Sequence, residues 1–343
     1  MKALYFSQHG GPEVMEYGDL PDRKPGPGEA LVRVHAVALN HMDLWVRRGG
    51  PAFEKLPKPH VGGADVAGIV ASYGESATGP AVGSRVVVDP GVVTGEDEWT
   101  RRGEDSVSPH YHILGEDIWG GCAEYVTVPA VNLLPIPNGV DFSQAAAPAL
   151  VFLTAWRMLV KRAQVKAGET VAIVGAGGGV NSAAIQICKH LGATVYAVTS
   201  TPEKMQRAQE LGADHAINHK AEDWSRAVFL ATGKRGVDVV VDNVGAATWM
   251  QSIRALARGG RLVNVGSTSG PTAEMDLRLV FRKQISLIGS TMGSHQDFRD
   301  VMSLIWSGKL KPVIDCVMPL SEGRTAHERL ERGEQFGKVV LTP

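Results

Sequence analysis

The segment VAIVGAGGGVNSAAIQICKHLGA, residues 171–193, constrains the fold of this chain more than any other stretch. It joins an apolar, strand-like run, a turn of glycines and a helical pattern with one apolar face. Gly177, Gly178 and Gly179 remove the side chains that would keep backbone N–H groups away from a pyrophosphate, and the helix after them presents its positive end to the anion. The segment therefore predicts a dinucleotide-binding strand–turn–helix unit.

The same alternation continues along the second half of the chain. From about residue 151, helical patterns separate strand-like runs, which read VAIVG, TVYAVT, HAIN, VDVVVD, RLVNVG and ISLIGS. Strands joined by crossover helices form a doubly wound parallel sheet. We therefore predict an α/β domain with six parallel strands over residues 151–295.

Residues 1–150 follow a different pattern. Their apolar runs, ALVRVHAVAL, ADVAGIVAS, SRVVVD and AEYVTVP, are short and are broken by Gly and Pro. This is typical of a small, mostly antiparallel β domain. The tail, residues 296–343, holds a helical pattern, MSLIWSGKL, and a closing strand, GKVVLTP. It is too short to fold alone, so we expect it to rejoin one of the first two domains.

Composition excludes several functional classes. The net charge of -1, without any long Lys/Arg run, gives no electrostatic footprint for nucleic acid or an anionic membrane. The N-terminus lacks the apolar core of a signal peptide, and no apolar stretch reaches the width of a bilayer, so we expect a cytoplasmic protein. Cys122, Cys188 and Cys316 are odd in number and far apart, which argues against disulfides and a Cys-x-x-Cys zinc site.

Further motifs occur along the chain in a fixed order: PGPGEALVRVHAVALNHMDLWVRRG, GGADVAGIV, GGCAEYVTVP, DVVVDNVG, GGRLVNVG and GKVVL. With the glycine turn, they make the chain resemble the medium-chain dehydrogenase/reductase superfamily over essentially its whole length. Within it, the quinone-oxidoreductase-like and zinc-type alcohol-dehydrogenase-like branches are the most similar. The resemblance implies a GroES-like β domain built from residues 1–150 and 296–343, an inserted Rossmann domain at 151–295, and an active site in the cleft between them.

The glycine turn departs from this family at one position. The last loop glycine of the family, which lets helix and strand pack closely, corresponds to Asn181. Asparagine tolerates a left-handed backbone better than most residues, so the position can be accommodated. The alternative is a weakened or reshaped cofactor site.

Zinc-dependent family members take their catalytic ligands from three places, and this chain departs from them at each. Where they carry a cysteine, Gly-His-Glu and a second cysteine, it has Asn40, Gly63-Ala64-Asp65 and Leu150. Alanine and leucine cannot bind zinc and an amide binds it poorly, so we expect no metal. The alternative is an improvised site of His41, His60 and Asp65, although we interpret His60 as an ordinary loop histidine.

Residues 94–108, TGEDEWTRRGEDSVS, match in length a lobe that many family members build around a structural zinc. The four cysteine positions of that lobe fall on Thr94, Asp97, Thr100 and Ser108. We expect a lobe without zinc, held by turns, hydrogen bonds and ion pairs of Arg101 and Arg102. The alternative is a replacement metal site formed by His110, His112 and neighbouring carboxylates.

Without a metal, positioned hydrogen-bond donors must stabilise the charge that hydride transfer creates on oxygen. Asn40 matches an asparagine of zinc-free relatives and is the first candidate donor; the alternative is an asparagine bonded to its own turn. Asp43 is expected to orient the loop, or simply to cap a helix. His41 matches a position that contacts the pyrophosphate or shuttles protons, unless it is a surface histidine. Trp45 is expected to line the substrate cleft, with a core position as the alternative.

The remaining expected contacts are with the cofactor. Thr154 matches the residue packed beside the nicotinamide, although a core threonine would look the same. Lys338, in FGKVVL, matches a basic position that reaches the phosphates. The C-terminal ends of parallel strands are where open α/β sheets bind ligands. The loop and strand-end contacts are Gly177, Gly178, Gly179, Val180, Val244, Val265, Gly266, Ser267, Gly289, Ser290 and Thr291.

The end of the second parallel strand bears on the choice of dinucleotide. NAD-specific sites usually carry an acid there, whereas this chain has Thr199, followed by Ser200. Ser200 and Lys204 can hold a 2′-phosphate, and His219 is expected beside the adenosine. We therefore expect NADP(H) to be preferred and NAD(H) to be possible. The alternative is that Thr201 simply caps the next helix and Lys204 lies in solvent.

Together these features predict a metal-independent NAD(P)H oxidoreductase acting on a small quinone, enone or carbonyl substrate. One alternative is an alcohol dehydrogenase that holds zinc through atypical ligands, and another is a weakly catalytic NADP(H)-binding sensor. No nucleic-acid or membrane partner is expected. An apolar edge strand near residues 285–290 predicts a homodimer or homotetramer.

Overall fold

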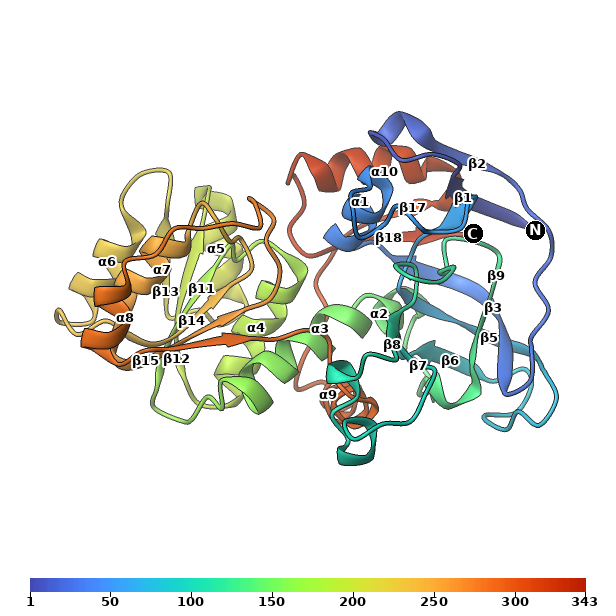
Figure 1. The fold of residues 1–343 in the computed structure, drawn as a ribbon, viewed down its shortest axis with the longest axis horizontal. Helices are drawn as coiled ribbons and strands as arrows, with labels where there is room; N and C mark the ends of the chain where they lie inside the picture. Colours follow the sequence, from blue (N-terminus) through green and yellow to red (C-terminus); the bar gives the residue numbers. More distant parts are fainter. The chain divides into compact units, whose positions relative to one another are not determined.

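The computed structural model describes all 343 residues, which form two compact units (Figure 1). Unit 1 consists of Met1–Leu153, Gly293–Ser307 and Lys311–Pro343, and unit 2 of Thr154–Met292 and Gly308–Leu310. Both termini therefore belong to unit 1, and unit 2 is an insertion between its parts. None of the helices combines the length and apolarity needed to cross a bilayer.

Unit 2 is built on a six-stranded sheet in which all neighbouring strands run parallel. In spatial order the strands are β13 (His215–Asn218), β12 (Thr194–Thr199), β11 (Thr170–Val174), β14 (Val237–Asp242), β15 (Leu256–Asn264) and β16 (Ser286–Gly289). The order reverses between β11 and β14, which lie side by side although β12 and β13 come between them in the chain. The predicted six-stranded, doubly wound Rossmann sheet is confirmed.

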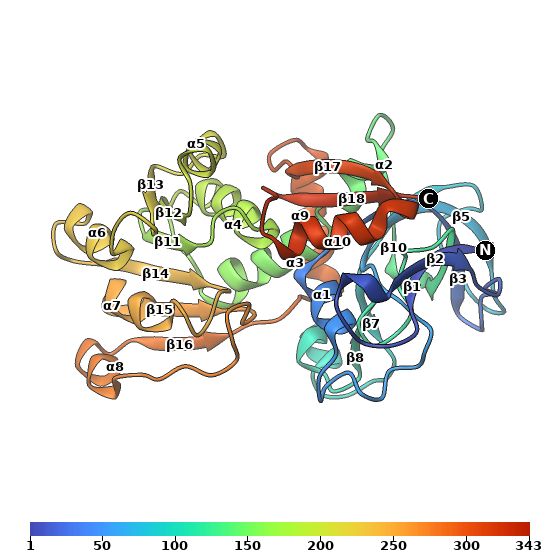
Figure 2. The same cartoon turned by 90° about the horizontal axis from the view of Figure 1, so that it is seen from above.

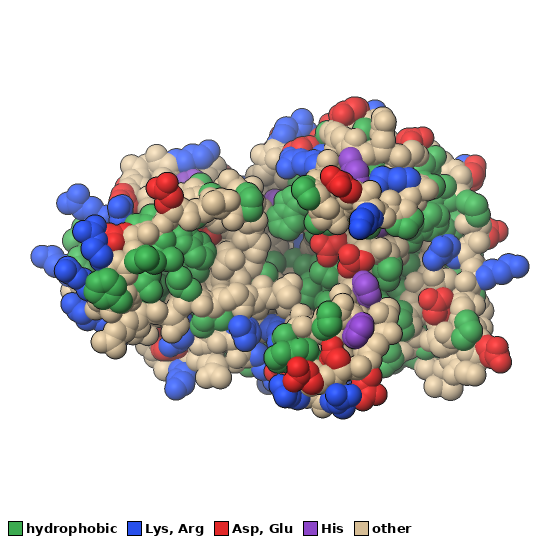
Figure 3. Space-filling model, in the orientation of Figure 1, with side chains coloured by type: hydrophobic (Ala, Val, Ile, Leu, Met, Phe, Trp, Pro, Cys, Tyr) green, Lys and Arg blue, Asp and Glu red, His purple; other side chains and the backbone are tan.

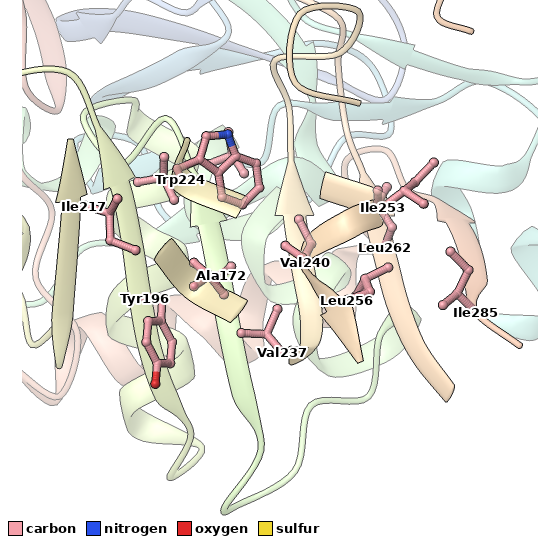
Figure 4. Packing of buried hydrophobic residues seen from close by; sticks show 14 residues of the cluster. Ala172, Tyr196, Ile217, Trp224, Val237, Val240, Ile253, Leu256, Leu262 and Ile285 are labelled. Carbon is pink, nitrogen blue, oxygen red and sulfur yellow. The ribbon is translucent and has the colours of Figure 1, made fainter. Parts of the chain in front are cut away.

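Helices cover both faces of this sheet because its strands are apolar on both sides. They are α4 (Gly179–His190), α5 (Pro202–Glu210), α6 (Trp224–Ala231), α7 (Trp249–Ala255) and α8 (Leu277–Lys283). On one face, alternate strand residues such as Tyr196, Val240 and Leu262 pack with Trp224 of α6 and Ile253 of α7 (Figure 4). The period of two along each strand places these side chains on one face.

Unit 1 is a β domain with small helices at its margins. Its largest sheet has the order β10 (Leu133–Pro135), β6 (Arg85–Val88), β5 (Asp65–Tyr73), β3 (Glu29–Ala38), β18 (Lys338–Thr342) and β17 (Ile314–Pro319), with β9 (Tyr125–Pro129) also paired to β3. Smaller sheets join β2 (Met15–Asp19), β1 (Lys2–Phe6) and β4 (His60–Val61), and β7 (Gly91–Val93) with β8 (Tyr111–Ile113). Only β17 and β18 pair in parallel, so the predicted antiparallel character holds.

The helices of unit 1 include α1 (His41–Arg48), α2 (Phe142–Ala146), α9 (His295–Trp306) and α10 (Gly323–Glu331). α3 (Ala149–Trp156) begins in unit 1 and ends in unit 2. Figure 2 shows α10 beside β17 and β18.

Apart from Gly308–Leu310, the C-terminal segment lies in unit 1, where β18 pairs with β3. The helix predicted from MSLIWSGKL is wrong in its bounds. It starts earlier, where Ser294 caps the first turn of α9, and ends at Trp306 before Gly308, whose φ of 73° is left-handed. The sequence analysis did not foresee β17 or α10.

The outer edge of the parallel sheet is apolar and exposed. Strand β16 pairs only with β15, and its Leu287 is 39% exposed. In α8, the helix that precedes β16, Leu277 and Phe281 are each 64% exposed. Figure 3 shows hydrophobic side chains gathered over the part of unit 2 that carries α6, α7 and α8. An unpaired apolar edge is covered most simply by a second copy of itself.

We predict a homo-oligomer, most simply a two-fold dimer, joined through β16. Leu287→Asp places a charge in that interface and should shift the molecular mass measured by light scattering to that of a monomer. Val82→Asp, at a position 62% exposed in unit 1, serves as the control and should leave the mass unchanged. A monomeric wild-type protein at micromolar concentration would contradict the prediction.

Candidate active site

Strand register brings Lys338 and Asn40 together from opposite ends of the chain. The antiparallel pairing of β18 with β3 places Val340 opposite Ala38, and the N–H of Leu39 donates to the carbonyl of Val339 over 2.9 Å. Continued by two residues, this register sets Lys338 opposite Asn40. On the other side of β3, Ala38 pairs with Asp65, the first residue of β5.

A buried cluster of polar groups forms where these strands end. The Lys338 Nζ lies 2.7 Å from Oδ2 of Asp65 and also donates to Oδ1 of Asn40. The Asn40 Nδ2 donates to the same Asp65 oxygen over 3.0 Å, and the N–H of Leu150 donates to Oδ1 over 2.6 Å. The Asp65 side chain is 0% and that of Lys338 4% exposed, so their charges are compensated by each other and not by water.

Burial raises the pKa of the Asp65 carboxyl above its ordinary value. The Lys338 ammonium group, the Asn40 amide and the Leu150 N–H oppose this rise because each stabilises the carboxylate. These three donors satisfy both oxygens of the Asp65 carboxylate.

Asp43 orients the loop between β3 and α1, as predicted from the sequence. It is the third residue of α1, and its Oδ2 accepts the N–H of Asn40 over 2.7 Å, as in a capping box. Its Oδ1 accepts the N–H of Gly63 over 2.8 Å. Burial raises the pKa of Asp43 to about 6, although both backbone bonds act to lower it. Gly63 is required there because its φ is 93° and a Cβ would lie 2.7 Å from the Cys122 sulfur.

His41 begins α1 and is half-buried next to this cluster. Burial, followed by the positive charges of Lys338 and Arg48, lowers the pKa of His41 to about 4, so its imidazole is neutral at pH 7. Trp45, one turn further along α1, is half-buried. The sequence analysis missed Glu116, whose pKa burial raises to about 7, helped by the charges of Asp117 and Asp43. No sequence motif marks this residue.

The structure places Lys338 differently from the sequence interpretation. The sequence analysis expected it to reach the cofactor phosphates, whereas its ammonium group is held by Asp65 and Asn40 inside unit 1. This placement does not support a phosphate contact. The register of β18 on β3 was the signal that could have revealed it, but strand pairing between segments about 300 residues apart cannot be read from a motif.

His60 is not the loop histidine expected from the sequence. It lies in β4, is 0% exposed, and its Nε2 is 3.1 Å from the carbonyl oxygen of Gly115. Burial lowers the pKa of His60. No three His, Cys, Asp or Glu side chains in the chain come together in a group that could hold a metal ion.

The lobe at residues 94–108 is held by hydrogen bonds and ion pairs, as predicted. The Asp97 carboxylate accepts the N–H groups of Trp99 and Thr100 through Oδ1 and the Ser108 hydroxyl through Oδ2, the last over 2.8 Å. Arg101 pairs with Glu96 and Arg102 with Glu98. Of the four positions that match the family's cysteines, Thr100 and Ser108 therefore each bond to a third, Asp97.

In unit 2, the glycine turn leads into a helix whose first turn is left open. Gly178 is the N-cap of α4 and offers no side chain, whereas Thr201 caps α5 and Asp223 caps α6. The first N–H groups of a helix have no partners within it, so those of α4 are available to an anion. The turn lies where the strand order reverses, next to β14, which is the usual place for a dinucleotide in such a sheet.

Asn181 is accommodated for a reason other than the one expected. It lies inside α4 with a helical backbone, not a left-handed one. Its buried Nδ2 donates to the carbonyls of Val174 and Gly175 over 2.8 and 2.7 Å, and its amide pairs with that of Asn243. Asn181 therefore fixes the shape of the turn through hydrogen bonds, while the open N–H groups of α4 stay free for the cofactor.

Several of the other predicted cofactor residues follow the C-terminal ends of the strands, whereas Thr154 lies in α3 and Val180 in α4. Asp242, Asn264 and Gly289 are in register, so the residues that follow them in the chain emerge together at the C-terminal ends of the strands. The Ser290 hydroxyl there is buried without a partner. Thr154 is 3% exposed and bonds to the Met292 sulfur. Their contacts with a cofactor, and those of Val180, Val244, Val265, Gly266, Ser267 and Thr291, remain predictions.

Thr201 caps α5, as the alternative interpretation held: its hydroxyl accepts the N–H of Lys204 over 3.2 Å. Thr199 is 3% exposed, Ser200 and Lys204 are half-buried, and His219 is exposed. The N–H of His219 donates to the carbonyl of Thr199. These residues lie together at the end of β12, and none of them is acidic.

Comparison with known proteins agrees with this architecture. Residues 26–138 match the family model for the alcohol dehydrogenase GroES-like domain, and residues 179–307 that for zinc-binding dehydrogenases. The chain is 32% identical to a quinone oxidoreductase of Pseudomonas aeruginosa, covering 100% of this chain and 99% of that protein. It belongs to the medium-chain dehydrogenase/reductase superfamily.

Two further relatives are alcohol dehydrogenases. An NAD-dependent alcohol dehydrogenase of Sulfolobus acidocaldarius is 34% identical, with 99% of each chain covered. A crystal structure described as an NAD-dependent alcohol dehydrogenase is 44% identical and covers 100% of both chains, with a TM-score of 0.95. The chain is therefore a nicotinamide-dependent oxidoreductase of the quinone-oxidoreductase-like and alcohol-dehydrogenase-like type.

We predict that Asp43→Asn destabilises unit 1. An amide has one acceptor oxygen, so it cannot serve the N–H groups of both Asn40 and Gly63. The free energy of unfolding in urea at pH 8 should fall by about 1 to 3 kcal/mol. Glu54→Gln, the same chemical change at an exposed position, should alter it by less than about 0.5 kcal/mol. Equal stability of the two variants would show that Asp43 does not hold the loop.

Proposed function

We propose that the protein is a metal-independent reductase that uses NAD(P)H to reduce a small quinone, enone or carbonyl compound. The observation that carries this proposal is the buried cluster of Asn40, Asp65 and Lys338. Bound nicotinamide supplies a hydride. The protein must then stabilise the negative charge that develops on the acceptor oxygen.

Asn40 is the donor best placed for this task. Its Oδ1 and one hydrogen of its Nδ2 are engaged by Lys338 and Asp65, while the second Nδ2 hydrogen has no acceptor in the protein. The side chain is 7% exposed, so the amide sits at the boundary of the buried cluster. His41, the next residue along the chain, has a neutral imidazole at pH 7. It can relay a proton by giving its N–H proton to the reduced substrate while its other ring nitrogen takes one from water.

The residue types around the cluster support a reaction without metal. The ligand positions of zinc-dependent relatives carry Asn40, Ala64 and Leu150, two of which have no ligand atom. The carboxylate beside them, Asp65, is neutralised by the Lys338 ammonium group. A divalent cation would have to displace that ammonium group, and its ligands in the cluster would be only the Asp65 carboxylate and the Asn40 amide.

Turnover after metal removal tests this proposal. We expect the chelator-treated, dialysed protein to oxidise NADPH or NADH with a quinone, enone or aldehyde at the rate of untreated protein, followed at the nicotinamide absorbance. Elemental analysis should find no stoichiometric zinc. One tightly held zinc per chain, with activity lost on its removal, would support an alcohol dehydrogenase with atypical ligands. Cofactor binding without turnover on any acceptor would support a sensor.

For the cofactor, we propose a preference for NADPH. No acid at the end of β12 repels a 2′-phosphate, and Ser200 and Lys204 can donate hydrogen bonds to it. The cap formed by Thr201 fixes the backbone of Lys204, because the Thr201 hydroxyl accepts its N–H. NAD-dependent relatives exist, so NADH remains a possible second cofactor.

Lys204→Ala should weaken NADPH binding about ten-fold, and NADH binding much less, because only NADPH carries the 2′-phosphate. Dissociation constants from fluorescence titration of both cofactors give the comparison. Lys220→Ala, an exposed lysine two residues after the end of β13, is the control. Equal losses for both cofactors, or tighter NADH binding by the wild type, would leave Lys204 with no part in phosphate recognition.

We further propose a cytoplasmic homodimer or homotetramer that acts on a small-molecule substrate, with no nucleic-acid or membrane partner. The near-zero net charge and the exposed β16 edge support this assignment.

A further inference from the structure

We propose that Lys338 and Asp65 are positioning residues, which together fix the orientation of the Asn40 amide and strengthen it as a hydrogen-bond donor. This inference rests on the proposed function of Asn40. It gives Lys338 a role other than the phosphate contact expected from the sequence, and it gives Asp65 a role that needs no metal ion.

Charge alone determines which way the Asn40 amide faces. An amide can usually exchange its oxygen and nitrogen by a half-turn, at little cost when its partners both donate and accept. Here one partner is an ammonium group, which only donates, and the other a carboxylate, which only accepts. The observed orientation satisfies both: Oδ1 of Asn40 faces Lys338, and Nδ2 faces Asp65. The reverse would set oxygen against carboxylate and nitrogen against ammonium.

This orientation aims the remaining N–H of Asn40. The two hydrogens of an amide nitrogen are fixed in its plane, so a bond from one of them to Asp65 sets the direction of the other. The backbone of Asn40 is held as well, because its N–H donates to Asp43. Backbone and side chain are thus both locked before any substrate binds, which is what a preorganised donor requires.

The cluster also makes the amide a better donor. An ammonium group on Oδ1 draws electron density from the amide, so its N–H bonds become more polar, and the low dielectric of a buried site strengthens the effect. The Asp65 carboxylate pairs with the lysine and accepts a hydrogen bond from it. Neither residue needs to touch the substrate, because both act through Asn40.

The competing interpretation is that the ion pair only stabilises unit 1. Removing one partner of a buried pair is strongly destabilising, so single variants cannot separate the two roles. Lys338→Met/Asp65→Asn removes both charges and keeps an acceptor oxygen for the N–H of Leu150. Replacing a buried ion pair by neutral groups is often tolerated. An asparagine at position 65 can offer Asn40 either oxygen or nitrogen, so the Asn40 amide loses its fixed orientation.

The experiment compares wild type, Asn40→Ala, Lys338→Met and the double variant in thermal unfolding and in turnover of a quinone with NADPH. The control is Lys189→Met/Asp214→Asn, which neutralises an ion pair in unit 2 whose aspartate likewise accepts a backbone N–H. We expect Lys338→Met to lower the melting temperature and the double variant to recover most of it. The double variant should lose kcat about ten-fold while KM for the quinone changes less than about two-fold. The control pair should keep both constants.

A second readout does not depend on activity. In protein labelled with nitrogen-15 at asparagine, the side-chain amide of Asn40 is the proton pair missing from the Asn40→Ala spectrum. In the wild type its two protons should have widely separated shifts, because only one of them bonds to a carboxylate. In the double variant the separation should shrink.

Retained kcat in a folded double variant would overturn the proposal, and so would an unchanged Asn40 proton pair. If the double variant does not fold, the wild-type spectrum still tests the proposal. Two Asn40 amide protons with a separation like that of a solvent-exposed asparagine would overturn it. Failure of the proposed function can be distinguished from failure of this positioning role. In that case the wild type reduces no acceptor or Asn40→Ala keeps full turnover, whatever the spectra show.

Discussion

The buried ion pair between Lys338 and Asp65 is the interaction on which unit 1 and its site depend together. It joins the start of β18, the start of β5 and, through Asn40, the end of β3. A buried carboxylate needs compensation that water cannot supply, so the C-terminal strand must return to the first domain for the fold to tolerate Asp65. The same contact that closes the sheet also sets the Asn40 amide, so stability and the proposed chemistry share one set of atoms.

At two other places in the chain, side-chain hydrogen bonds hold a loop at positions where many family members have a glycine or zinc-binding cysteines. Asn181 stands where a glycine is usual, and its amide ties the two carbonyls below the turn. The lobe positions Asp97, Thr100 and Ser108 stand where cysteines hold a structural zinc, and they form a network centred on one carboxylate. In both places a short polar side chain satisfies nearby backbone groups, which helps to keep the local shape.

The two units would contribute different kinds of group to the proposed reaction. Unit 2 offers backbone N–H groups at the uncapped start of α4, which suit an anion of any detailed structure. Unit 1 offers one oriented side-chain donor supported by charges. Anion binding needs only a helix end and glycines from one segment. A single donor aimed at one oxygen needs several segments of the chain to be placed accurately relative to one another. This difference explains why the anion site is easily seen in a sequence, whereas for the donor the sequence suggested Asn40 but not the residues that hold it.

The sequence by itself determined the six parallel strands, the glycine turn, the antiparallel β domain and a lobe at residues 94–108 held by hydrogen bonds and ion pairs. These follow from local periodicity and residue type, which depend only on near neighbours in the chain. Only the tertiary structure decided the partners of Lys338, the burial of His60, the unusual pKa of Glu116 and the role of Asn181. Each of these depends on residues brought together by strand register and packing, and the free energy of a buried charge or amide is set by those distant neighbours.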